Sequence, residues 1–337
     1  MGGGANRTHG TRGATLTEAK AIALLEQRLG SLPAGGRIRV GIGDDAAVLR
    51  PSGANLIWTV DASIEGVHFD FGWLTPADVG WRSYHAAMSD IAAMGARPLA
   101  ALSSVVLPEG TSRAALAAFA RGQADAAKSC GCPVIGGNVA RGPGWQVTTT
   151  VLGESRRPLL RNAARPGDEL WLTGGVGLAA AGLQLLRQRS GSAPVRWSAG
   201  ERTCVQAWRR PQALLEEGRQ LVGRARAAMD ISDGLKADLP KFAAASGVRL
   251  VVDQDLLEAA LPEMLRAAAA RLRQSHLELA LLGGEDYALV ASGPRRKRPR
   301  WVRVIGSVRD GQGAVLEQRG RVLSLLAGGF DHFQRRG

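Results

Sequence analysis

Short acidic motifs interrupt otherwise apolar, Gly- and Ala-rich stretches of this 337-residue chain. They are Gly43-Asp44-Asp45-Ala46, Thr59-Val60-Asp61, Ser89-Asp90-Ile91, Asp230-Ile231-Ser232-Asp233-Gly234 and Gly284-Glu285-Asp286. An unpaired carboxylate in apolar surroundings is costly, so we expect a positive group to meet them. The chain has five His and three Cys residues, and no Cys/His constellation is present. Oxygen ligands of this kind favour Mg²⁺ over zinc.

Carboxylates that hold Mg²⁺ from several distant segments indicate a polyphosphate substrate, of which ATP is the simplest. Each motif alone could equally be a set of helix N-caps and turn formers. The GxxxxGK[ST] P-loop and the HRD and DFG signatures of protein kinases are missing. The segment 173–180 matches GxGxxA, but a polar loop follows where a dinucleotide fold needs a strand ending in an acid. We interpret it as a plain strand–helix turn.

Composition narrows the class of protein further. Apolar residues make up 45% of the chain, but no run approaches the 18 residues of a membrane span. The first fourteen residues are Gly-rich and polar, which predicts a disordered tail and no signal peptide. Three cysteines cannot form a disulfide framework, so we expect reduced thiols and a cytoplasmic protein. The net charge of +13 comes mostly from Arg, and we interpret the basic run 295–300 as a solvated loop, so nucleic acid is not an expected partner.

The apolar pattern predicts a mixed α/β chain of two domains, 15–155 and 156–337, after a tail at 1–14. Polar residues and two prolines mark the boundary near 156–166. Strands are expected at 37–41, 46–49, 56–60, 99–107, 133–135, 146–152, 169–173, 248–252, 286–291 and 301–308. Helices are expected at 15–29, 76–94, 112–129, 178–189, 201–222 and 234–246.

Seven motifs together resemble thiamine-monophosphate kinases, in the same order and from about Glu18 to Phe333. They are GIGDDAAVL, TVDASIEGVHF, SDIAAMGARP, GGNVARGP, RPGDELWLTG, MDISDGL and GGEDYALV. That family belongs to the superfamily of aminoimidazole ribonucleotide synthetase and selenophosphate synthetase. The resemblance implies a homodimer whose N-terminal domains bind ATP and several Mg²⁺ ions and form a shared barrel. It implies phosphorylation of thiamine monophosphate to thiamine diphosphate.

The resemblance also assigns residues. It implies metal ligands at Asp45, Thr59, Asp61, Asp90, Asn138, Asp230 and Asp233. It implies ATP contacts at Gly137, Arg161 and Ser232, and substrate contacts at His68, Glu285 and Phe330. The acceptor phosphate is largely a dianion at neutral pH, so direct in-line attack on the γ-phosphorus needs no general base. Charge would be neutralised by Mg²⁺ held by Asp61, Asp90 and Asp230.

The chain departs from the family pattern at three positions. Asn138 stands where the family has an acidic metal ligand, Ala87 where Asn is usual, and Val60 where a second Thr is common. The Asn removes a negative charge beside a dication. These departures leave open a diverged, non-catalytic or redirected paralogue that binds nucleotide or thiamine phosphates. Another ATP-dependent enzyme of the superfamily is the second alternative, although no Cys precedes Cys130 and none ends the chain.

Overall fold

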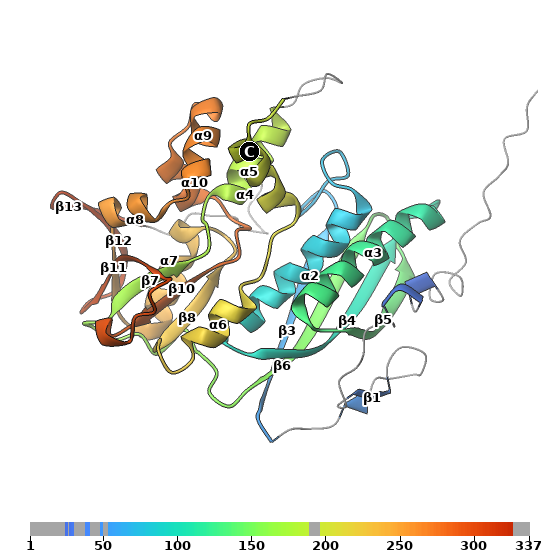
Figure 1. The fold of residues 1–337 in the computed structure, drawn as a ribbon, viewed down its shortest axis with the longest axis horizontal. Coiled ribbons are helices and arrows are strands. Elements are labelled where there is room, and N and C mark those ends of the chain that lie inside the picture. Colours follow the sequence, from blue (N-terminus) through green and yellow to red (C-terminus); the bar gives the residue numbers. More distant parts are fainter. Residues whose placement is uncertain are drawn as a thin grey trace, which may run out of the picture.

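The computed structural model describes residues 24–25, 27–29, 38–40, 48–49, 53–188 and 196–325. Within this part of the chain, one four-stranded and one seven-stranded sheet are both covered by helices (Figure 1). Strands β1 (Ile38–Val40) and β2 (Val48–Leu49) form a separate antiparallel pair. The mixed α/β prediction is confirmed. No described helix is both long enough and apolar enough to cross a membrane.

The four-stranded sheet has the order β3-β6-β4-β5. Its strands are β3 (Asn55–Ile64), β4 (Arg97–Leu107), β5 (Val134–Arg141) and β6 (Gln146–Ser155). Strands β4 and β5 are parallel and are joined by helix α3 (Arg113–Cys130), whereas the other pairs are antiparallel. Helices α2 (Pro76–Ala93) and α3 cover one face and bury Tyr84, Met88 and Ile91 against it.

Local sequence explains where these two helices begin and end. Thr75 and Asp78 form a capping box before α2, and Pro76 stands in its first turn, where its missing N–H costs nothing. Ser112 caps α3, and Gly131 ends it in the left-handed conformation that glycine adopts freely. The expected helices 76–94 and 112–129 therefore agree closely with the structure.

The second sheet has the order β13-β12-β9-β11-β7-β10-β8, and all pairs except β12–β9 are antiparallel. Its strands are β7 (Glu169–Thr173), β8 (Ala227–Ile231), β9 (Arg249–Asp253), β10 (Ala288–Gly293), β11 (Arg303–Arg309), β12 (Gly313–Gln318) and β13 (Arg321–Ser324). Its helices are α4 (Leu178–Arg187), α5 (Ala199–Arg209), α6 (Leu215–Leu221), α7 (Leu235–Ser246), α8 (Gln254–Ala260), α9 (Glu263–Leu272) and α10 (His276–Leu282), and a 3₁₀ turn spans Arg295–Lys297.

The structure corrects several sequence-based boundaries. The single helix expected at 201–222 is two helices, α5 and α6, with Pro211 between them, because proline disrupts a helix interior. The strand expected at 133–135 continues to Arg141. Strand β8 was not predicted, nor were α8, α9, α10, β12 and β13. Of the helix expected at 15–29, the described residues 24–25 and 27–29 are helical, and the rest lies outside the described residues.

Helix α2 also joins the two sheets. The indole N–H of Trp81 donates to the carbonyl of Pro211 at 2.7 Å, and Arg210 forms an ion pair with Asp78 at 2.8 Å. At the other end of α2, the hydroxyl of Ser89 donates to Asp230 of β8 at 2.8 Å. One helix therefore fixes how the second sheet lies against the first.

His85 on α2 makes the stability of this contact between the two sheets depend on pH. Its Nδ1 accepts the backbone N–H of Ala213 at 3.1 Å, and burial lowers its pKa from 6.5 to about 4. The folded state thus favours the neutral ring. The contribution of this ring to the free energy of unfolding is complete above pH 6.5 and is lost as the pH falls towards 4. We expect a loss of about 1.4 kcal/mol per pH unit in that window from this residue.

The measurement is urea unfolding of the wild type and of His85→Gln between pH 7 and pH 4.5. The variant should lose less stability over this range, because glutamine cannot be protonated there. His276→Gln is the control, and it should keep the wild-type slope. Equal slopes for His85→Gln and the wild type would contradict the assignment.

Candidate functional site

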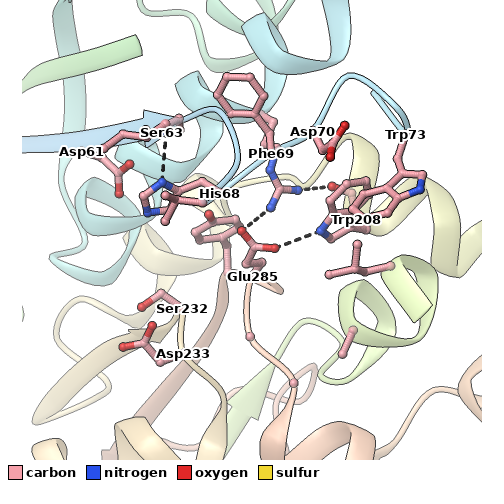
Figure 2. A pocket seen from close by; sticks show the side chains of 18 of the residues that line it. Asp61, Ser63, His68, Phe69, Asp70, Trp73, Trp208, Ser232, Asp233 and Glu285 are labelled. Carbon is pink, nitrogen blue, oxygen red and sulfur yellow. Dashed lines mark hydrogen bonds and ion pairs between the residues drawn. The ribbon is translucent and has the colours of Figure 1, made fainter. Parts of the chain in front are cut away.

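A cavity of about 760 Å³ lies between the two sheets (Figure 2). Its walls come from the end of β3 and the loop after it, from α2, α4 and α5, and from the loops β8–α7 and α10–β10. The lining combines aromatic rings with charged groups: Phe69, Trp73, Trp208 and Tyr287 with Asp61, Asp70, Arg82, Arg187, Asp233 and Glu285. Such a lining suits an aromatic ligand that carries charge.

A buried arginine organises one wall of the cavity. Arg82 of α2 is 3% exposed, forms an ion pair with Glu285 and donates to the backbone carbonyl of Trp208. Its guanidinium also lies 4.9 Å from the centre of the Trp208 indole ring. Burial alone would lower the pKa of Arg82, but the charge of Glu285 and its hydrogen bond, together with Tyr287 and Asp61, outweigh that effect, and the pKa is raised. Arg82 is therefore a fixed cation.

Glu285 is held from both sides. Its Oε2 accepts the indole N–H of Trp208 at 2.9 Å, while its Oε1 meets Arg82 (Figure 2). Its backbone has φ +67°, a left-handed conformation that is uncommon outside glycine, and its N–H donates to the Ser232 carbonyl at 2.6 Å. Strained backbone of this kind persists where the surroundings over-determine it, often at binding sites. The Glu285 carboxylate is thus presented to the cavity in one orientation.

The loop after β8 is fixed by a buried carboxylate. Asp238 accepts the backbone N–H groups of Ser232 at 3.0 Å and Asp233 at 2.8 Å. Lys241 bridges Asp238 and Asp233 at 2.9 and 2.6 Å. These contacts hold Ser232 and Asp233 in the lining of the cavity (Figure 2).

A second group of acids lies where α2 meets β3 and β8; Asp230 is buried, and Asp61 and Asp90 are half-buried. The Thr59 hydroxyl on β3 donates to Asp90 of α2, and Ser89 donates to Asp230 of β8. Burial, together with the nearby charge of Asp90, raises the pKa of Asp230 to about 7, although the hydrogen bond from Ser89 acts in the opposite direction. Asp61 stands two residues beyond Thr59, on the same face of β3 and in the cavity lining. Carboxylates from three elements therefore converge here.

A side chain of the protein itself binds the backbone N–H groups of the glycine-rich turn before α4. Asp286 accepts the backbone N–H of Gly177 at 2.5 Å and that of Ala179 at 2.8 Å. Burial raises the pKa of Asp286 to about 7, although these two hydrogen bonds act in the opposite direction. A carboxylate thus occupies the helix N-terminus at which a dinucleotide fold binds its pyrophosphate.

Comparison with known proteins agrees with this architecture. Residues 43–155 match the family described as AIR synthase related protein, N-terminal domain, and residues 165–317 match the corresponding C-terminal domain. Thiamine-monophosphate kinase from Aquifex aeolicus is 32% identical over 87% of this chain and 92% of its own length. The protein of the same name from Mycobacterium tuberculosis is 33% identical over 91% of this chain and 90% of its own.

This chain belongs to the thiamine-monophosphate kinase family. A solved structure described as AaThiL complexed with AMPPCP and TMP is 31% identical, covers 97% of this chain and 100% of that one, and has a TM-score of 0.77. The expected two-domain fold and the expected enzyme class are confirmed.

The structure brings most of the residues carried over from the kinase family to one place. Those lining the cavity are Asp61, His68, Ser232, Asp233 and Glu285. Thr59, Asp90 and the buried Asp230 form the adjoining cluster. The Nδ1 of His68 accepts the Ile64 backbone N–H at 3.0 Å, which leaves Nε2 to carry the proton of the neutral ring.

The other assigned residues lie elsewhere. Gly137 and Asn138 are exposed on β5, and Asn138 pairs with Ser104, which places it on the opposite sheet face from Asp61. Arg161 is exposed outside the cavity lining, and its carbonyl accepts the Ser246 hydroxyl at 2.7 Å. Asp45 and Phe330 lie outside the described residues.

Sequence reasoning missed the residues that shape the cavity walls. Arg82 could have been noticed as a lone cation within the apolar helix 76–93. Trp73, Trp208 and Tyr287 carry no comparable signal, because an aromatic residue is more often part of a core. Burial raises the pKa of Tyr287 far above its usual range; the charge of Glu285 raises it further, whereas the charge of Arg82 lowers it.

The donor set suits Mg²⁺ in combination with a phosphate ligand. Among the described residues no three His, Cys, Asp or Glu side chains could hold a metal ion by themselves. Mg²⁺ usually keeps several waters and binds one or two carboxylates together with substrate phosphates, so a complete protein cage is not required. Asp90 and Asp230 are oxygen donors, and a cation between them would relieve their repulsion. The residues present fit the ion.

Removing Glu285 should destabilise the fold through Arg82. Glu285→Ala leaves a buried guanidinium without its counter-ion, and we expect a loss of roughly 2–4 kcal/mol in the free energy of unfolding. The double variant Arg82→Met/Glu285→Leu should recover much of that loss, because it removes both charges together. Urea unfolding of the wild type, single and double variants would measure the coupling. If the losses in unfolding free energy at the two sites were additive, the proposed coupling between Arg82 and Glu285 would be refuted.

Proposed function

We propose that this kinase-family member transfers the γ-phosphoryl group of ATP to thiamine monophosphate, giving thiamine diphosphate and ADP. The observation that carries the proposal is the cavity, where aromatic walls and carboxylates meet beside the acidic cluster around the buried Asp230. The family relatives bear the name of this activity, and the related AaThiL structure holds AMPPCP, an ATP analogue, and TMP.

The cavity matches the chemistry of a thiamine phosphate. Thiamine carries a cationic thiazolium ring and an aminopyrimidine, both flat and aromatic. The indole rings of Trp73 and Trp208, with centroids 6.3 Å apart, offer apolar surface for such rings. Glu285 and His68 supply polar groups at the same wall. We propose His68, Glu285 and Phe330 as substrate contacts, and Trp73 and Trp208 as further ones.

The protein's role in the transfer is to bind and align two anions. Thr59, Asp61, Asp90, Asp230 and Asp233, with Asp45, are proposed to hold Mg²⁺, and Ser232 to contact ATP. The resemblance also assigns Asn138 to Mg²⁺ and Gly137 and Arg161 to ATP, but these three residues lie away from the cavity within one chain. When bound, Mg²⁺ would neutralise the charge that keeps the two phosphates apart. The fixed β8–α7 loop and the fixed Glu285 would orient the acceptor for in-line attack. No side chain needs to remove a proton, because the attacking phosphate oxygen is already ionised at neutral pH.

The test is an assay with ATP, Mg²⁺ and thiamine monophosphate that follows thiamine diphosphate and ADP by chromatography. The wild type should form both in equal amounts. Asp230→Asn should lower kcat by about a hundredfold or more, because the loss of one metal-binding charge costs several kcal/mol in the transition state. It should not lower the melting temperature, since it removes the repulsion between the buried Asp230 and the neighbouring Asp90.

Asp125→Asn, an exposed change on α3, is the matched control and should leave turnover intact. ADP without thiamine diphosphate would redirect the proposal to another acceptor. Nucleotide binding without turnover would favour the non-catalytic paralogue to which Asn138, Ala87 and Val60 point.

We also propose that the chain divides into domains 15–155 and 156–337. We propose further that two copies form a homodimer through the face of the first sheet that no helix covers. Leu56, Trp58 and Val60 of β3 are 54%, 69% and 63% exposed, and the strand register places Leu102, 37% exposed, on the same face. A contiguous apolar patch on a sheet commonly marks an interface. A second copy covering it would form the shared barrel. The three free cysteines agree with a cytoplasmic location.

Trp58→Glu should convert this dimer into a monomer, because it places a charge at the centre of the apolar face. Size-exclusion chromatography with light scattering measures the mass of each species. Val322→Glu changes a residue of similar exposure on β13 and should leave the mass of the wild type unchanged. A wild-type protein that is monomeric at tens of micromolar would sink the proposal.

A further inference from the structure

A second hollow, of about 900 Å³, lies on the other domain and is surrounded by arginines. Arg295, Arg296, Arg298, Arg300 and Arg303 line it, with Leu256 of α8 on one side. They come from the 3₁₀ turn after β10, from the segment that follows and from the first residue of β11. The basic run noted in the sequence therefore lines an open, shallow hollow.

This hollow is separate from the proposed active-site cavity. Strand β10 begins at Ala288, directly after the cavity residue Tyr287, and ends at Gly293, just before the basic segment. The five residue steps between them span roughly 17 Å along the strand. The acidic cavity and the basic hollow thus lie at opposite ends of the same sheet.

The arginines have almost no protein partners. Within the described residues, Arg298 forms an ion pair with Glu169 at 3.3 Å, and no hydrogen bond or ion pair reaches the other four guanidinium groups. Lys297 is turned away, since its ammonium donates to the Gly223 carbonyl at 2.9 Å. Like charges gathered at one place repel each other and create a local field that attracts anions.

The backbone that carries these arginines is well fixed. Lys297 N–H donates to the Pro294 carbonyl at 2.8 Å, and Arg298 N–H donates to the Arg295 carbonyl at 3.1 Å. Pro299 is buried, and Arg303 already belongs to the central strand β11. A rigid support lowers the entropy that must be lost when a ligand binds.

We propose that this hollow binds the polyphosphate chain of a small ligand, at a site distinct from the catalytic cavity. A guanidinium presents parallel N–H donors that match phosphate oxygens, so several together favour an anion with more than one phosphate. The volume is that of a small-molecule site. The arginines surround one hollow and do not follow a helix or strand, which favours a compact ligand over a nucleic acid. This inference does not depend on the proposed kinase reaction.

The test uses the full chain, with inorganic tripolyphosphate as the probe in isothermal titration calorimetry. EDTA is included at physiological ionic strength, so that no Mg²⁺ supports binding at the acidic cavity. Arg296→Gln/Arg300→Gln should weaken tripolyphosphate binding by at least about tenfold, because two charge-assisted contacts are lost. Arg113→Gln/Arg121→Gln removes the same charge from exposed positions on α3 and should bind like the wild type.

Both double variants should keep the wild-type melting temperature and turnover. Equal weakening in the two variants would show a non-specific effect of net charge and overturn the proposal, as would unchanged binding in Arg296→Gln/Arg300→Gln. ATP or ADP binding more tightly than tripolyphosphate would identify a nucleotide as the ligand, and equal binding would identify the polyphosphate chain itself. A single-stranded RNA that binds through the same arginines, with no binding of tripolyphosphate, would overturn the proposal in favour of a nucleic acid.

Discussion

The guanidinium of Arg82 lies on helix α2, which packs on the first sheet, and its ion pair reaches Glu285 beside the second sheet. Desolvating these charges is costly, so the pair is tolerated only while Trp208 supplies a carbonyl, an indole N–H and a ring face around it. The position of each domain is thereby tied to the geometry of the other. Movement of α2 would leave a buried cation unpaired, and the cavity depends on that constraint.

Helix α2 also brings Asp90 close to Asp230 of β8, a carboxylate whose burial is costly in the folded protein. Asp90 lies beside Asp230, and burial raises the pKa of Asp230. Among the described residues, the Ser89 hydroxyl donates a hydrogen bond to Asp230, but no cation pairs with it. A protein that only needed stability would not gather carboxylates there. Functional sites commonly accept such a cost, because the missing positive charge arrives with the substrate. In the proposed reaction, Mg²⁺ and the phosphates of ATP would fill that role.

Charge is distributed along the second sheet with opposite signs at its ends. Asp233 and Glu285 follow or precede strands at the end that faces the cavity, whereas the arginines after β10 gather at the other end. The +13 net charge of the chain therefore does not describe either surface. The two ends would attract different chemical groups: a bound cation at one and a free polyanion at the other.

Local sequence was sufficient where the physical cause is local. The Thr75–Asp78 capping box with Pro76 defines the start of α2, and the apolar run Glu169–Thr173 appears as β7 at its predicted bounds. The break at Pro211 and the strand β8 were missed. The Ala-containing run of β8 is a strand because β10 pairs with it and because it is buried along its whole length.

The motifs alone marked Asp61, Asp90, Asp230 and Glu285, since acids in apolar stretches signal a cost that needs an explanation. Tertiary structure decided which groups meet. Arg82 and Trp208 stand 126 positions apart and touch only because α2 and α5 pack at the domain junction. It also placed Asn138 on the opposite face of the sheet from Asp61, although both lie in motifs of the same kind. The sequence determines which residue types are present, but the distance between two charges depends on packing between distant elements.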